Sequence, residues 1–211
     1  MSPAGVVKIS KKEKREENKK MEIKKIISMC KKSGQLLLIE NGGDQWISDG
    51  FALYPLVNMP PFDEETVCRA YDISESKASK MRIEMRPKIP TGYDISDDVE
   101  NESPCDYEEP MFGGLVPVQT SQGMMFIKGQ YLTPFKGMPE DMIRIFERYS
   151  DSVGIYFAIK VGFVLSAIVM PYDCINDSLV NRMERVYEQC KLALLNKNGK
   201  EEKNEKRAEE E

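Results

Sequence analysis

The residue types that usually perform catalysis do not occur here in a catalytic arrangement. The chain of 211 residues contains no histidine, the common general base near neutral pH. Its five cysteines are far apart in the sequence, and no Cys-x-x-Cys pair occurs that could begin a zinc site. They are Cys30, Cys68, Cys105, Cys174 and Cys190. The Gly-Gly pairs at 42–43 and 113–114 lack the context of a phosphate-binding loop. The sequence therefore predicts a non-enzyme without catalytic residues, metal or cofactor, whose cysteines are free thiols.

The densest group of ionisable residues is a run of eight carboxylates between Asp94 and Glu109. Proline and glycine flank it, so we expect residues 87–114 to form a long acidic loop. Its spacing does not fit a calcium loop, because the central glycine and the distal glutamate are missing. Two interpretations stay open. The loop is a solvated linker, or it imitates phosphates and stacked bases in the basic channel of a partner. The partner-binding residues would then be Asp94, Asp97, Asp98, Glu100, Glu102, Asp106, Glu108, Glu109, Tyr93 and Tyr107.

A second charged group lies on an amphipathic helix predicted over residues 21–32. Its apolar residues recur at i, i+3, i+4 and i+7 from Ile23 to Cys30, which places the basic side chains on the opposite, solvated side. The basic residues are Lys24, Lys25, Lys31 and Lys32. They are candidate contacts for nucleic acid, or they only keep the exposed side of the helix solvated.

Two stretches that must position these groups resemble each other, Gly43 to Pro60 and Gly123 to Pro139. In each, an apolar strand precedes the stretch and a segment predicted to be helical follows it, at 63–72 and at 140–149. The pattern predicts an α+β fold of two pseudo-symmetric strand–strand–helix–strand repeats, with helices on one face of a curved sheet.

The domain boundaries follow from composition. Residues 1–20 are rich in Lys and Glu and are predicted to be a disordered basic arm, and residues 197–211 a disordered charged tail. Between them we expect a single α+β domain over 21–196, with repeat one at 34–86, the acidic linker at 87–114, repeat two at 115–175 and a closing helix at 176–195. A net charge of −5 argues against a general nucleic-acid coat. No signal peptide or membrane span is recognisable, so we expect a cytoplasmic protein without a membrane partner.

Short motifs resemble two groups of known proteins. Residues 46–53, Trp-Ile-Ser-Asp-Gly-Phe-Ala-Leu, resemble a strand motif of DNA sliding clamps (processivity factors), and residues 163–171 resemble a domain-terminal clamp strand. This resemblance implies a clamp-like curved sheet over about residues 21–175, although the segments at 63–72 and 140–149 are mixed or acidic in charge, whereas a clamp lines its channel with basic helices. Residues 48–56 also resemble small phage and mobile-element proteins of gut bacteria, a group that includes anti-CRISPR inhibitors of RNA-guided nucleases.

These observations lead to three expectations about function. The first is a non-enzymatic binding protein of phage type that engages a nucleic-acid-processing complex and inhibits a host defence nuclease, so its partner is a protein or ribonucleoprotein nuclease complex. The second is a sliding-clamp-like accessory that binds DNA directly. The third is an enzyme with an unrecognised carboxylate site. The oligomeric state stays open.

Overall fold

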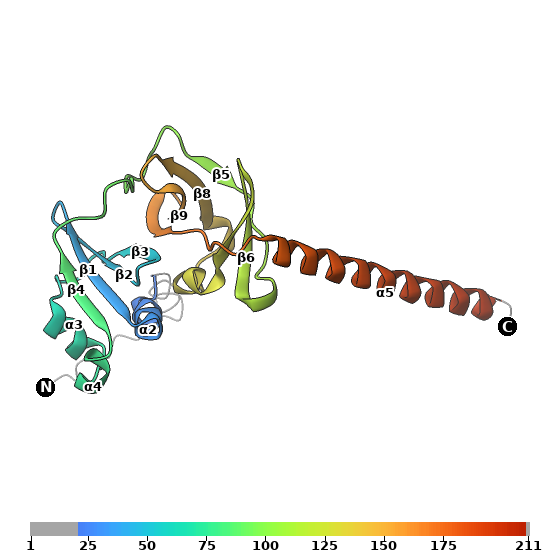
Figure 1. Cartoon of the computed structure of the whole chain (residues 1–211), viewed down its shortest axis with the longest axis horizontal. Helices are drawn as coiled ribbons and strands as arrows, with labels where there is room; N and C mark the ends of the chain where they lie inside the picture. The colour runs from blue at the N-terminus through green and yellow to red at the C-terminus, as the bar shows by residue number, and fades with distance from the viewer. Residues whose placement is uncertain (1–20, 210–211) are drawn as a thin grey trace, which may run out of the picture. The chain divides into compact units, whose positions relative to one another are not determined.

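An eight-stranded mixed sheet is the centre of the first of two units into which the chain divides, residues 1–172 and 173–211. The computed structural model describes the backbone of residues 21–209 and the side chains of residues 21–198 other than Phe112. The strand order is β4-β1-β2-β3-β10-β9-β8-β5, and β1 and β4 are the one parallel pair within it. Figure 1 shows β4 beside β1 in one part of this sheet and β5 beside β8 in the other. A separate hairpin, β6–β7, completes the strands of the described chain. The predicted α+β class is confirmed.

The first half of this unit follows the sequence prediction closely. Its elements are α2 (Ile23–Ser33), β1 (Gln35–Asn41), β2 (Asp44–Ser48), β3 (Ala52–Pro55), α3 (Glu64–Ala70), α4 (Glu75–Ala78) and β4 (Arg82–Arg86). Helix α2 ends at Gly34, which has φ 75° and donates its N–H to the Cys30 carbonyl at 3.0 Å. Helix α3 begins with a capping box, in which the Asp63 carboxylate accepts from the Thr66 N–H at 2.7 Å.

The second half departs from the prediction. Its elements are β5 (Ser103–Cys105), η1 (Phe112–Gly114), β6 (Leu115–Thr120), β7 (Gly123–Lys128), η2 (Gly129–Phe135), η3 (Glu140–Met142), β8 (Ile143–Ser150), β9 (Gly154–Val161) and β10 (Val164–Val169). The helix predicted over 140–149 is wrong, because most of that segment is strand β8, which pairs with β9 along its full length. The stretch from Gly123 to Pro139 is strand only as far as Lys128 and continues as the 3₁₀ helix η2. The second half therefore has 3₁₀ helices and no α-helix between β7 and β8, so the two predicted repeats are not seen, and the sheet is open, with edge strands β4 and β5.

The sheet has two covered faces, because alternate residues of a strand point to opposite sides. We call one the helix face; it includes Leu38, Ile47, Tyr54, Phe157 and Ala167, and buried residues of α2, α3 and the β6–β7 hairpin join its core. The other we call the loop face; it includes Leu37, Trp46, Leu53, Tyr156 and Ile168. Its cover comes from irregular chain, since Ile89, Tyr93 and Ile95 pack against it.

The second unit contains helix α5 (Asp177–Glu209), which is longer than the helix predicted over 176–195. The side chain of Asn176 caps its start by accepting from the Leu179 N–H at 3.0 Å. Within residues 21–209, no helix is both long and apolar enough to cross a membrane. The basic arm predicted for residues 1–20 lies outside the described residues.

Candidate binding surface on the acidic segment

The residues from Ile89 to Glu109, here called the acidic segment, are strongly one-sided in charge. They contain eight carboxylates, and no lysine or arginine occurs between Lys88 and Lys128. Such a segment would be expected to stay away from an apolar sheet unless positive and polar groups hold it there. The structure supplies these groups from β8 and β9.

Arg148 of β8 is the main anchor, and its guanidinium is almost completely buried, with 1% of the side chain exposed. Its Nη1 and Nη2 donate to the backbone carbonyls of Asp94 and Ser96 at 2.8 and 2.9 Å. Its Nε and Nη2 also donate to one carboxylate oxygen of Glu102, at 2.9 and 2.7 Å. One side chain thus satisfies two carbonyls of irregular chain and a buried carboxylate, which a lysine could not do with this geometry.

Lys160 of β9 completes the charge balance. Its ammonium pairs with the other oxygen of Glu102, and it lies 4.6 Å from the centroid of the Phe146 ring. Arg144 and Lys160 are direct neighbours across β8 and β9, as are Arg148 and Tyr156, so the sheet register places Arg148, Tyr156 and Lys160 on the same face. Glu102 is therefore a buried carboxylate held between two cations.

Further polar contacts fix the first part of the acidic segment. The Tyr156 hydroxyl accepts from the Asp94 N–H at 2.9 Å, and the Asp97 carboxylate accepts from the Leu165 N–H at 2.7 Å. The Tyr93 ring packs edge-on against Tyr156, with ring centroids 5.3 Å apart. Hydrogen bonds from Ser96 hold the pKa of Asp94 below its usual value, and the charge of Arg148 acts in the same direction.

The last part of the acidic segment lies along strand β6. The Glu108 N–H donates to the Pro117 carbonyl at 3.2 Å, and the Gln119 N–H donates to the Asp106 carbonyl at 2.9 Å. Tyr107, between them, forms a bridge with Val118, and its hydroxyl donates to the Ile143 carbonyl at 3.4 Å. This part therefore has a fixed backbone as well.

These contacts divide the ten candidate residues into two sets. Tyr93, Asp97, Glu102 and Tyr107 contact the eight-stranded sheet through their side chains, and Asp94 contacts it through its backbone. The other five are exposed and form no ion pair within the described residues. This exposed set, called the acidic surface, consists of Asp98, Glu100, Asp106, Glu108 and Glu109.

The four candidate lysines of α2 do not form one free basic patch. Lys25 pairs with Glu22 at 2.6 Å and also donates to the Thr133 carbonyl. Lys31 donates to the Tyr71 carbonyl at 2.7 Å. Lys24 and Lys32 are exposed. Two of the four thus fasten α2 to neighbouring segments, and only two are left for an outside ligand.

Sequence reasoning missed Arg148, Lys160 and Tyr156 as the residues that position the acidic segment. One signal was present, since Lys160 interrupts an otherwise apolar strand, and a buried charge of this kind needs a partner. Arg148 gave no such signal, because its segment was predicted to be a helix, and a charged residue is ordinary on the solvent side of a surface helix.

Comparison with family models, with curated proteins and with solved structures finds no match to this chain. Among the described residues, no cluster of three or more acidic or thiol side chains is close enough to hold a metal ion.

Proposed function

We propose that this chain is a non-enzymatic binding protein that inserts its acidic surface into the basic nucleic-acid channel of a nuclease complex and so inhibits it. The partner class is the one expected from the sequence, an RNA-guided defence nuclease of the CRISPR type. The observation that carries the proposal is the burial of Glu102 between Arg148 and Lys160.

That anchor matters because it changes what an acidic segment can do. A free linker pays the entropy of ordering when it binds, whereas a segment already held in one conformation does not. The backbone contacts of 94–102 and of 106–108 present five carboxylates from a fixed chain. Fixed negative charges without neighbouring cations suit a groove that normally binds the phosphates of nucleic acid.

The clamp-like accessory that binds DNA directly is the second candidate. It would need basic surface to displace counterions. Since Lys25 and Lys31 are engaged inside the fold, α2 offers less of that surface than its sequence suggests. The same experiment distinguishes the two candidates.

The test is a DNA gel-shift at low and moderate salt, with the protein alone and with a guide-loaded CRISPR-type nuclease. We expect no retention of DNA by the protein alone, and loss of DNA binding by the nuclease when the protein is added. The test variant neutralises four exposed carboxylates, with Asp98→Asn, Glu100→Gln, Glu108→Gln and Glu109→Gln. It should inhibit roughly tenfold less well or worse, because each exposed ion pair contributes about 0.2–1 kcal/mol.

The control variant makes the same change in charge elsewhere on the exposed surface, with Glu40→Gln, Asp44→Asn, Glu64→Gln and Asp151→Asn. It should inhibit like the unaltered chain. Equal loss in both variants would mean that only net charge matters, and salt-sensitive binding of DNA by the protein alone would favour the clamp-like accessory.

A further inference from the structure

A second site lies on the first unit, at the end of β7, and it has the opposite charge. Lys128 is the last residue of β7, and its ammonium lies 4.5 Å from the centroid of the Tyr172 ring and 5.4 Å from that of Phe51. Both rings are about half exposed, at 41% and 53%. Lys128 has no ion pair with any carboxylate of the described chain, so its charge is balanced only by two aromatic rings.

Backbone hydrogen bonds bring these three residues together from distant parts of the sequence. The Met170 N–H donates to the Phe51 carbonyl at 2.9 Å, and the Tyr172 N–H donates to the Phe126 carbonyl at 2.6 Å. The chain that follows β10 is therefore hydrogen-bonded both to Phe51 and to strand β7, which ends in Lys128. The arrangement exists before any ligand arrives.

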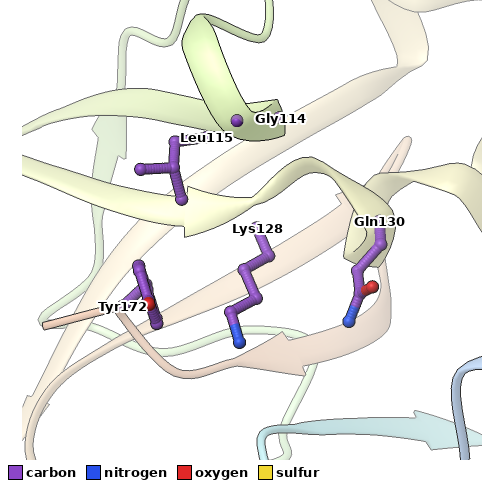
Figure 2. A pocket seen from close by; sticks show the side chains of 6 residues that line it. Gly114, Leu115, Lys128, Gln130 and Tyr172 are labelled. Carbon is purple, nitrogen blue, oxygen red and sulfur yellow. The ribbon is translucent and has the colours of Figure 1, made fainter. Parts of the chain in front are cut away.

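Lys128 also lines a pocket of about 410 Å³, together with Gly113, Gly114, Leu115, Gln130 and Tyr172. Figure 2 shows that the Lys128 and Gln130 side chains extend in the same direction from neighbouring positions, with the Tyr172 ring to one side of Lys128. The walls are held close together, since a Cβ at Gly129 would lie only 2.9 Å from the Gly114 carbonyl oxygen. At Gly113 and Gly114, by contrast, a Cβ would meet no atom within 4 Å, so this wall is bare backbone facing open space.

We propose that this pocket binds a carboxylate carried on a flat apolar body, with the Lys128 ammonium donating to the carboxylate and the ring of Tyr172 and the side chain of Leu115 packing on the body. A pocket of this volume is of the size that small organic ligands occupy. The site is separate from the acidic surface and does not depend on the function proposed above.

Charge and shape together select this ligand class. The lining contains one cation, Lys128, which matches the single charge of a carboxylate, whereas a phosphate dianion usually meets several donors or an arginine. The amide of Gln130, which also lies beside the Tyr131 phenol, has two N–H donors, so it can serve the second carboxylate oxygen. The exposed rings offer flat apolar surface next to the charge.

The experiment is a titration of the full chain with benzoate, followed through the backbone amide signals by NMR. We expect saturable shifts at Gly113, Gly114, Leu115 and Gln130. Benzamide, which has the same shape without the charge, should cause no saturable shift. Lys128→Met keeps an unbranched stem between the two rings and removes the charge, so it should weaken benzoate binding about tenfold or more. Lys128→Arg should retain most of the affinity.

Lys136→Met is the matched control, because Lys136 is an exposed lysine of the same unit that does not line the pocket. It should bind benzoate as the unaltered chain does. The proposal is overturned if benzoate causes no saturable shift, or if Lys128→Met binds it as well as Lys136→Met. It is equally overturned if inorganic phosphate shifts the same amides at lower concentration than benzoate, which would identify a phosphate site.

Discussion

The helix face and the loop face of the sheet are covered in different ways. On the helix face, α2, α3 and the β6–β7 hairpin bury apolar side chains, and these elements satisfy their own backbone hydrogen bonds. On the loop face, irregular chain has no such internal bonding. Arg148, Tyr156 and the backbone of β10 satisfy its carbonyl, amide and carboxylate groups instead. A sheet can therefore be covered without a helix, provided that its own side chains supply the missing partners.

The two kinds of cover should differ in stability. The helix face loses its apolar contacts only when a large area becomes exposed, so its opening is expected to coincide with global unfolding. The cover of the loop face near β8 and β9 depends on a few charged contacts around Glu102. Removing one of them should loosen that segment while the helix face stays closed.

Among the substitutions that test this difference between the two faces, Glu102→Gln should lower the free energy of unfolding most. The substitution leaves Arg148 and Lys160 buried without a counter-charge, which typically costs about 3–5 kcal/mol. Urea unfolding measures the change in the free energy of unfolding. Glu100→Gln is the matched control in the same segment, because Glu100 is exposed and has no ion pair among the described residues. Its effect should stay within about 0.5 kcal/mol. Similar losses in both variants would contradict the role given to Glu102.

Two thiols can report separately on the helix-face core and on strand β5, which follows Glu102 directly and packs Cys105 against the edge of that core. Cys30 is fully buried in the helix-face core, where burial and the charge of Asp49 raise its pKa. Cys105 ends the edge strand β5, three residues after Glu102, and burial raises its pKa to about 11. A thiol reagent reaches Cys30 only after the surrounding structure opens, whereas Cys105 is partly exposed and becomes fully accessible when β5 detaches. Because β5 is an edge strand of three residues, Cys105 should react first.

The measurement uses a chain in which Cys68, Cys174 and Cys190 are replaced by serine. Glu102→Gln should speed the labelling of Cys105 by about tenfold or more, which corresponds to roughly 1.4 kcal/mol of easier opening, and should change Cys30 less. If both thiols accelerate equally, the chain around Glu102 and the helix-face core open as one unit, and the distinction between them fails.

The helix face could largely be predicted from the sequence. The i, i+3, i+4, i+7 spacing in α2 and the apolar runs of β1, β9 and β10 are local patterns, and Gly34 marks where α2 ends. The error at β8 has a physical cause. Ile143, Ile145 and Phe146 fit a helical spacing over a short stretch, and both faces of β8 are partly covered, so the usual alternation is weak. Pairing with β9 decides the outcome, and that contact is not local.

The loop face could not be predicted in the same way. Glu102 and Arg148 are 46 residues apart, and nothing near either residue indicates the other. The register of β8 on β9 decides that Arg148 and Lys160 point to the same side, and a shift of one residue would reverse this. The composition of the acidic segment suggested a solvated linker as readily as an ordered surface, because composition does not show which carboxylates have partners. The Lys128 pocket was missed for a similar reason, since the two rings beside the Lys128 ammonium come from positions 51 and 172.

Asp94→Asn should have the smallest effect and tests whether the loop-face cover is sensitive to acid. Hydrogen bonds from Ser96, and then the charge of Arg148, lower the pKa of Asp94 in the folded chain. A lowered folded pKa means that the stabilisation is complete above the unfolded value of about 4 and is lost as the pH falls through the folded pKa. Asp94 is largely exposed, so after solvent screening the contribution is about a few tenths of a kcal/mol.

Urea unfolding at pH 6 should therefore show the unaltered chain slightly more stable than Asp94→Asn, and the difference should shrink as the pH is lowered below about 4. Ser96→Ala removes the hydroxyl donor and keeps the backbone donor, which holds Oδ1 at 2.8 Å, so it should remove only part of the difference. A difference that is the same at every pH would mean that Asp94 acts through the shape of the turn. In that case the charge of Asp94 would contribute nothing to the loop-face cover, and Glu102 would be the carboxylate through which the positive charge of Arg148 and Lys160 holds the acidic segment.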